Sequence, residues 1–201
     1  MHPDVCRLIS EMVYDARLES EPHTANQVLL LNKDAHLALA PTGVRFVPVH
    51  HDACSQQSEE EAELIRKLIE SLLQQRYQDK DKQDHPMTLE NILVVAPYNM
   101  QVNLLKRVLP AGARVGTVDK FQGQQAEVVI VSMTTSNEEY LPRFIDFLYS
   151  KNRHNVALSR AKSLALLVAN PELMSITCST PEQMALVNAL CWVWEYSGVS
   201  G

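Results

Sequence analysis

Long apolar segments are missing from this sequence. No run of apolar residues approaches the ~18 residues that a membrane-spanning helix needs. The first residues, MHPDVCRLISEM, also lack the basic stretch and the apolar core of a secretory signal peptide. These absences exclude the membrane-spanning and secreted classes, and we expect a cytoplasmic protein with no membrane partner.

Cysteine is also scarce. None of the four cysteines pairs with another at the CxxC spacing typical of zinc sites. A chain of 201 residues is long enough to bury a core without disulfide bonds. We therefore expect reduced thiols and no metal site for the full set, which is Cys6, Cys54, Cys178 and Cys191.

Positive charge is in short supply as well. The 18 Lys and Arg residues are outnumbered by 24 Asp and Glu residues, which gives a formal net charge of −6. Such a chain does not coat itself with nucleic acid by bulk charge attraction. The local exception is the segment 150–162, which has no acidic residue and four cations, Lys151, Arg153, Arg160 and Lys162. This segment is compatible with phosphate binding at one place.

What the sequence does contain is an alternation of apolar runs with amphipathic helices. The runs 92–96, 128–133 and 164–169 are apolar nearly throughout, which is typical of buried parallel strands. We expect an α/β fold over a single domain, residues 1–201, with a mostly parallel sheet and helices on both faces. Helices are predicted at 3–16, 58–76, 101–108, 142–149, 152–161 and 181–197, and further strands at 43–50 and 114–118.

Local signals refine this outline. Ser58 and Glu61 have the spacing of a capping box at the start of a helix. Pro48 predicts that the strand 43–50 lies at an edge of the sheet. The pair His50-His51 would point to opposite faces of that strand, so a structural role is expected rather than a shared metal ion. Residues 79–85 are predicted to be a loop, and 28–31 are left unassigned.

In open parallel sheets, ligands bind beyond the carboxyl ends of the strands. We therefore expect the segments after Val95, after Val118 and around Asn152 to converge on that edge.

Arg153 and Arg160 lie two helical turns apart, so both side chains would project to roughly the same side. The planar guanidinium of arginine stays charged and binds phosphate in a bidentate manner, which suits the charge that develops during phosphoryl transfer. The alternative is that both arginines cap or bridge structural acids.

Thr117, Asp119 and the pair Gln122-Gly123 lie where a strand gives way to a turn. A hydroxyl group and exposed backbone amides there can hold a nucleic-acid phosphate without reading sequence, and Gly123 permits close approach of a ligand to the backbone. The alternative is a plain turn in which Asp119 bonds its own backbone.

These two segments carry a family resemblance. VGTVDKFQGQQAEVVIVSMTTS (115–136) resembles motif V of superfamily 1 helicases, usually TVDxFQGxE before an apolar strand, and NRHNVALSRAK (152–162) is similar to motif VI. The opening MHPDVCRLISEMVYDARL and the later VVAPYNMQVNLL also resemble segments of the second RecA-like domain, the AAA_12 type, in the Upf-like and Dna-two-like branch. The four matches follow the family's order within residues 1–170.

The resemblance implies a RecA-like P-loop NTPase fold and a set of site residues. Arg160 would be the catalytic arginine finger, and Gly123, Gln125 and Arg153 would lie near the nucleotide. The usual motif V glutamate is Gln125 here, which keeps hydrogen bonding but loses the charge. The residues along the single strand would be Pro97, Tyr98, Thr117 and Asp119.

Other parts of the motor are missing from the sequence. No glycine is followed by lysine, so there is no GxxxxGK[ST] phosphate loop, and no Asp-Glu pair offers a Walker B site. ATP with Mg²⁺ would be bound mainly by a first RecA-like domain, in cis or in trans. The expected function is the C-terminal motor half of an ATP-dependent helicase, inactive alone.

Three further expectations concern the wider context. The strand it binds would be single-stranded, with DNA favoured over RNA. The segment FLYSKNRHNVALSRAK (147–162) and the tail with TPEQM (180–184) are similar to bacterial helicases joined to a RecB-like nuclease, although no acidic cluster for a nuclease lies in this chain. The alternative function is a non-catalytic adaptor or remnant that binds nucleic acid or a protein.

Overall fold

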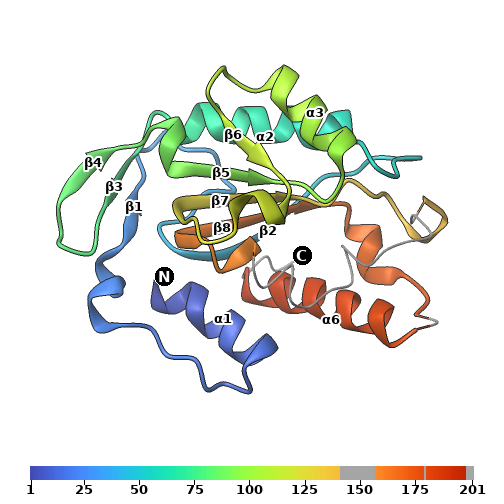
Figure 1. The fold of residues 1–201 in the computed structure, drawn as a ribbon, viewed down its shortest axis with the longest axis horizontal. Helices are drawn as coiled ribbons and strands as arrows, with labels where there is room; N and C mark the ends of the chain where they lie inside the picture. The colour runs from blue at the N-terminus through green and yellow to red at the C-terminus, as the bar shows by residue number, and fades with distance from the viewer. Residues whose placement is uncertain (141–156, 179, 198–201) are drawn as a thin grey trace.

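Five parallel strands form the centre of the molecule in a computed structural model, which describes residues 1–140, 157–178 and 180–197. Their order across the sheet is β2–β8–β7–β5–β6 (Figure 1). The bounds are β2 Gly43–Pro48, β5 Ile92–Val95, β6 Arg114–Gly116, β7 Ala126–Ser132 and β8 Ala161–Ala169. All neighbours in this sheet pair in parallel, so the predicted α/β fold with a mostly parallel sheet is confirmed.

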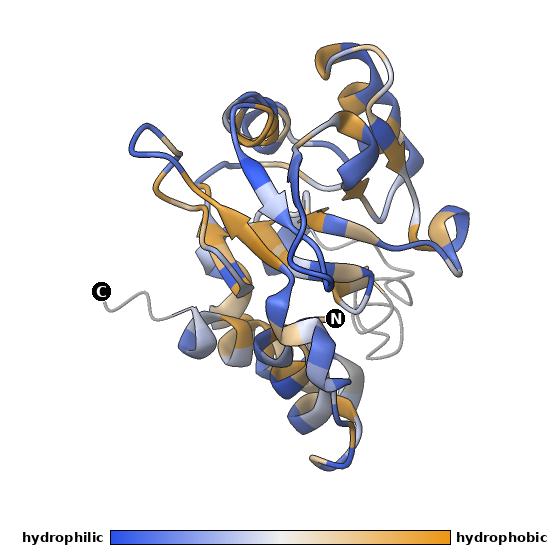
Figure 2. Cartoon of the chain, turned by 90° about the vertical axis from the view of Figure 1, so that its left-hand side faces the viewer, coloured by the Kyte–Doolittle hydropathy of each residue, from blue (hydrophilic) through white to orange (hydrophobic). Residues whose placement is uncertain are grey.

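The central strands are buried on both faces. Every residue of β7 is buried, as are all residues of β8 except Lys162. Figure 2 shows this concentration of hydrophobic residues in the sheet. Strand β2 lies at an edge, as Pro48 predicted.

Helices cover both faces of the sheet (Figure 1). One face is covered by α1 (Pro3–Val13), α6 (Pro181–Tyr196) and the short 3-10 helix η3 (Val118–Phe121). The other face is covered by α2 (Glu59–Leu72) and α3 (Asn99–Val108). The sheet therefore separates two hydrophobic cores.

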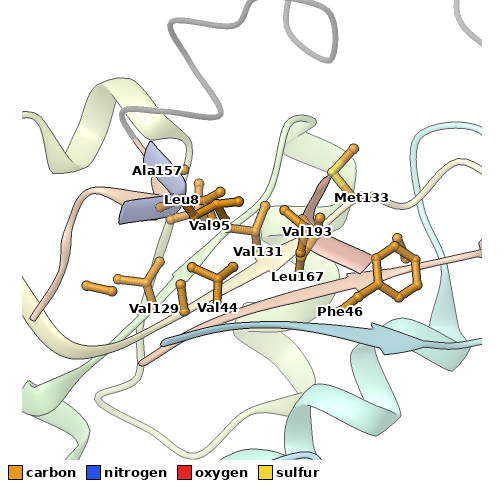
Figure 3. Packing of buried hydrophobic residues seen from close by; sticks show 14 of the residues in the cluster. Leu8, Val44, Phe46, Val95, Val129, Val131, Met133, Ala157, Leu167 and Val193 are labelled. Carbon is orange, nitrogen blue, oxygen red and sulfur yellow. The ribbon is translucent and has the colours of Figure 1, made fainter. Parts of the chain in front are cut away.

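The core under α1 and α6 is shown in Figure 3. Leu8 of α1 and Val193 of α6 pack against strand residues that include Phe46 and Val129. The Phe46 ring also meets Trp194 edge to face, with 5.2 Å between ring centroids. This packing fixes the terminal helices on the sheet.

A second, antiparallel sheet was not predicted. It contains β1 (Val28–Leu30), β3 (Arg76–Gln78) and β4 (Asp84–Pro86), in the order β1–β3–β4. The segment 79–85, predicted as a loop, is therefore largely the tip of a hairpin. The Asp79 carboxylate organises this tip, because it accepts the Asp81 and Gln83 N–H groups and lies 2.8 Å from the His85 ring.

The remaining differences concern the ends of elements. Helix α2 ends at Leu72 rather than at residue 76, and α1 ends at Val13 rather than at residue 16. The helices predicted at 142–149 and 152–161 lie outside the described residues, apart from the end of the second one. No helix in the described part of the chain is long and apolar enough to cross a membrane.

Candidate nucleotide and nucleic-acid sites

Two turns of the chain meet at the amino ends of β7 and β8. The turn that contains Gly123 and Gln125 leads into β7, and Arg160 immediately precedes β8. The Ala126 N–H donates to the Arg160 carbonyl at 3.1 Å, and Ala126 pairs with Ala161. The structure therefore brings two of the predicted nucleotide residues, Gln125 and Arg160, to neighbouring strand starts.

The Arg160 side chain is half-buried, and no hydrogen bond between it and another described residue is observed. Its Nε atom is buried and has no hydrogen-bond partner. No ion pair between described residues involves Arg160. The alternative that Arg160 bridges a structural acid therefore finds no support in the part of the chain that the structure describes. Arg153 lies outside that part.

The backbone conformation at position 123 favours glycine. Its φ of +78° lies in the left-handed region, which side chains with a Cβ rarely adopt. A Cβ added at Gly123 would meet no atom within 4 Å, so the turn is open to solvent on that side. Gln125 is exposed as well, so both predicted residues are accessible to a ligand.

A large cavity of about 800 Å³ lies beside Gln125, between the β3–β4 hairpin and the loop after α1. Its charged walls are mainly acidic: Lys80 and Lys162 face the carboxylates of Glu19, Glu21, Asp79, Asp81 and Glu127. Acidic walls disfavour a polyphosphate. The phosphate end of a nucleotide therefore does not fit this cavity.

Glu127 does not replace the missing motif V glutamate. It lies two residues past Gln125, and its side chain is only 10% exposed. Its carboxylate forms an ion pair with Lys162 at 2.8 Å and accepts a hydrogen bond from Asn91 at 2.9 Å. Through these bonds, Glu127 of β7 is joined to Lys162 of β8 and to Asn91, which precedes β5.

The predicted single-strand residues lie at the carboxyl ends of β5 and β6. Pro97 and Tyr98 follow β5, and Thr117 follows β6. Burial raises the pKa of Tyr98 to about 12, and its hydroxyl is buried without a hydrogen-bond partner among the described residues. Thr117 is half-buried. The structure therefore brings these three residues to one edge.

Asp119 is exposed at the start of η3. Its side chain forms no hydrogen bond with described residues, although its carbonyl accepts the Gln122 N–H. The alternative in which its carboxylate bonds its own backbone is therefore not observed. Asp119 is available to solvent beside Thr117.

The convergence expected at the carboxyl edge holds for the segment after Val95 but is wrong for the segment after Val118, because that segment leads to Gly123 and Gln125 at the amino end of β7. The segment around Asn152 lies outside the described residues, and Arg160 lies at the amino end of β8. The reason for the difference after Val118 is the short connection from β6 through η3, which crosses the sheet face and buries Val118 and Phe121. Strand β7, about 20 Å long at ~3.3 Å per residue, joins the two edges.

Sequence reasoning also missed a buried polar cluster at the carboxyl edge. Glu61 is fully buried and bonds His51, Ser132 and the Thr134 backbone. The capping box was half correct: Ser58 Oγ accepts the Glu61 N–H at 3.1 Å, but the Ser58 N–H donates to Gln101 instead of Glu61. The spacing of Glu61 from Ile65 and Leu68 places it on the buried face of α2, a signal that could have identified it.

Comparison with known proteins identifies the family of this chain. The model of the AAA_12 family, described as an AAA domain, matches residues 1–172. The chain belongs to the AAA_12 family. This result confirms the resemblance at the family level, and it agrees with the order of the sequence motifs.

Three relatives illustrate the similarity. The putative helicase MOV-10 of Gallus gallus is 28% identical over 87% of this chain and 20% of its own length. The uncharacterized ATP-dependent helicase C05C10.2 of Caenorhabditis elegans is 27% identical over 84% of the chain and 11% of its own length. The probable RNA helicase armi of Drosophila melanogaster is 33% identical over 45% of the chain and 8% of its own length.

The chain therefore spans a fifth or less of the length of these relatives. All three are animal proteins and none is named as a nuclease, so they lend no support to the bacterial nuclease fusion suggested by the TPEQM tail. That fusion stays a prediction.

Proposed function

We propose that this chain is the second RecA-like domain of an ATP-dependent helicase, and that it supplies an arginine to ATP bound on a first RecA-like domain. The observation that carries the proposal is the half-buried Arg160 guanidinium, which has no acceptor among the described residues and lies beside the motif V turn. Membership of the AAA_12 family and the helicase names of relatives support it.

The residues at the amino edge fit a nucleotide that is shared with another domain. A charged group without a partner in a partly buried place is stabilised by an anionic acceptor. Arg160 would bind the terminal phosphate, and Gln125 would donate or accept a neutral hydrogen bond on the exposed side of Gly123. ATP with Mg²⁺ would supply the phosphoryl group for transfer to water; this chain would contribute positive charge and orientation.

The single strand would follow the carboxyl edge, along Pro97, Tyr98 and Thr117. A half-buried tyrosine ring offers a stacking surface for a base, and a threonine hydroxyl offers a bond to phosphate. The names of relatives favour RNA over DNA, in contrast to the preference inferred from the sequence. Parallel titrations with single-stranded RNA and DNA of one sequence would decide between them. A cytoplasmic location remains part of the proposal.

The deciding experiment combines this chain with a first RecA-like domain, joined to it or added in trans, and measures ATPase activity. Arg160→Ala should lower kcat by about 10³-fold, as removal of an arginine finger typically does. Arg160→Lys should restore little, because lysine lacks the planar fork. Arg107→Ala, an exposed arginine on α3, is the matched control and should leave kcat unchanged.

Unchanged turnover in Arg160→Ala, with a melting temperature equal to that of the wild type, would contradict the arginine-finger assignment. In that case, binding of nucleic acid without any ATPase activity in the combined protein would favour the non-catalytic adaptor instead. Loss of the fold in Arg160→Ala would be recognised by circular dichroism, and Arg160→Lys would then provide the kinetic comparison.

A further inference from the structure

The buried cluster at the carboxyl edge is a chain of hydrogen bonds that ends on one carboxylate. Glu61 Oε1 accepts the Thr134 N–H at 2.9 Å and lies 3.2 Å from His51 Nε2. Glu61 Oε2 accepts the Ser132 hydroxyl. Gln101 Nε2 in turn donates to Ser132 Oγ at 3.0 Å. Glu61 on α2 is therefore bonded directly to the end of β7 and to the residue two positions beyond it.

Two donors in this cluster are fixed by their chemistry. The Thr134 N–H and the Ser132 hydroxyl both donate to Glu61. The Ser136 hydroxyl accepts the Cys54 N–H at 3.0 Å and lies 2.7 Å from His51 Nδ1, and either atom of this pair can donate to the other. Burial raises the pKa of Glu61, while the bonds from His51 and Ser132 oppose that increase.

The backbone that Glu61 holds is strained. Thr134 has a φ of +67°, in the left-handed region that a β-branched residue rarely adopts. Its N–H is bonded to Glu61, and the next side chain, Thr135, donates to the Ser55 carbonyl at 2.8 Å. These bonds hold the turn 133–136, with Thr134 in a conformation that it would leave if they were removed.

This turn lies near a predicted single-strand residue. Tyr98 packs against the same core as Met133. It is also the N-cap of α3, whose Gln101 donates to Ser132 at 3.0 Å. The turn ends the strand that begins next to Gln125. A shift of the turn would therefore reach Tyr98 through the shared core and the nucleotide edge through β7.

Ser136, His51 and Glu61 have the composition of a hydrolase triad, but their environment excludes that function. All three are buried, and the His51 and Glu61 side chains have no exposed surface. A serine nucleophile must meet its substrate. The cluster is therefore a support and not a catalytic site.

We propose that Glu61 is a positioning residue for the single-strand site: its carboxylate holds Ser132 and the strained turn 133–136 beside the core on which Tyr98 packs. This inference rests on the proposed function, because it assumes that Tyr98 contacts the single strand. The inference connects helix α2 to the single-strand site, because Glu61 of α2 is bonded to Ser132 and Thr134 at the end of β7.

The test uses the combined protein with both RecA-like domains and a fluorescent oligouridylate. Glu61→Gln is close in shape but can no longer accept on both atoms. It should weaken affinity for the oligouridylate about fivefold or more, the scale of one lost base-stacking contact. It should also raise the oligouridylate concentration for half-maximal ATPase while leaving the KM for ATP unchanged. Fluorescence anisotropy and steady-state kinetics measure these values.

Two control variants separate positioning from stability. Glu59→Gln makes the same charge change at an exposed position of α2, and it should bind as the wild type does. Ile69→Val removes a methylene group from the buried face of α2 and should lower the melting temperature without changing affinity. Affinity that falls equally in Glu61→Gln and Ile69→Val would overturn the proposal, as would wild-type affinity in Glu61→Gln.

Tyr98→Ala distinguishes this inference from the function on which it rests. Weak binding by Tyr98→Ala together with normal binding by Glu61→Gln would overturn the positioning role alone. Normal binding by Tyr98→Ala and by Thr117→Val would remove the single-strand assignment, and the positioning role with it. Weak binding by both Tyr98→Ala and Glu61→Gln, with normal controls, is the result expected.

Discussion

At the scale of single residues, the buried phenol of Tyr98 should make the stability of the fold depend on pH in the alkaline range. Its pKa is raised from 10.0 to about 12, mainly by burial. Between these values the folded state keeps the phenol proton that the unfolded state releases, so the native state binds more protons and stability falls as pH rises. Tyr98→Phe lacks this proton. We expect its melting temperature to decline less steeply than that of the wild type across this pH range.

Thermal melts by circular dichroism at a series of pH values provide the measurement. The pKa values of Tyr77 and Tyr196 are also raised by burial, and both remain in the variant, so part of the alkaline decline will persist. Identical slopes for Tyr98→Phe and the wild type would show that the Tyr98 phenol is not buried in solution.

At the scale of elements, the ion pair between Lys162 and Glu127 stabilises the junction of β7 and β8. The Glu127 side chain is 10% exposed and that of Lys162 is 32% exposed. Among the described residues, Lys162→Ala would leave a nearly buried carboxylate bonded only to Asn91. Because Lys162 is partly solvated, we expect a loss of about 2 kcal/mol in the free energy of unfolding, less than for a fully buried pair.

Urea denaturation measures this loss. Lys67→Ala is the matched control, since its pair with Glu63 is exposed and should contribute about 0–1 kcal/mol. Adding Glu127→Gln to Lys162→Ala should recover part of the stability, because the uncompensated charge disappears. A double variant as unstable as the sum of its singles would contradict the coupling.

The elements also show which strands a sequence pattern predicts and which it misses. The apolar runs of β5, β7 and β8 were predicted because a strand covered on both faces is hydrophobic throughout. Strands β3 and β4 were missed because their three-residue sequences, RYQ and DHP, contain no aliphatic residue that would indicate a strand. Their turn also places Lys82 at a φ of +62°, where glycine or asparagine would have signalled a hairpin.

At the scale of the whole molecule, the net charge of −6 limits how nucleic acid is held. Binding must depend on a local contact with few phosphates rather than on bulk attraction. We expect the logarithm of the oligouridylate association constant to fall with the logarithm of salt concentration at a slope of about −2, which corresponds to roughly three neutralised phosphates. Anisotropy titrations at several KCl concentrations measure the slope; a much steeper slope would indicate an extended basic tract.

The sequence by itself determined the α/β class, the order of the motifs and the candidate residues, because hydrophobic period and motif spacing are local properties of a chain. Only the tertiary structure decided which residues share an edge: Arg160 beside Gln125, and Tyr98 with Thr117 on the opposite side. It alone also decided that Glu61 is buried on Ser132 and that Arg160 lacks an acceptor among the described residues. Such partners come from segments far apart in the chain, and only the packing of the sheet and helices brings them together.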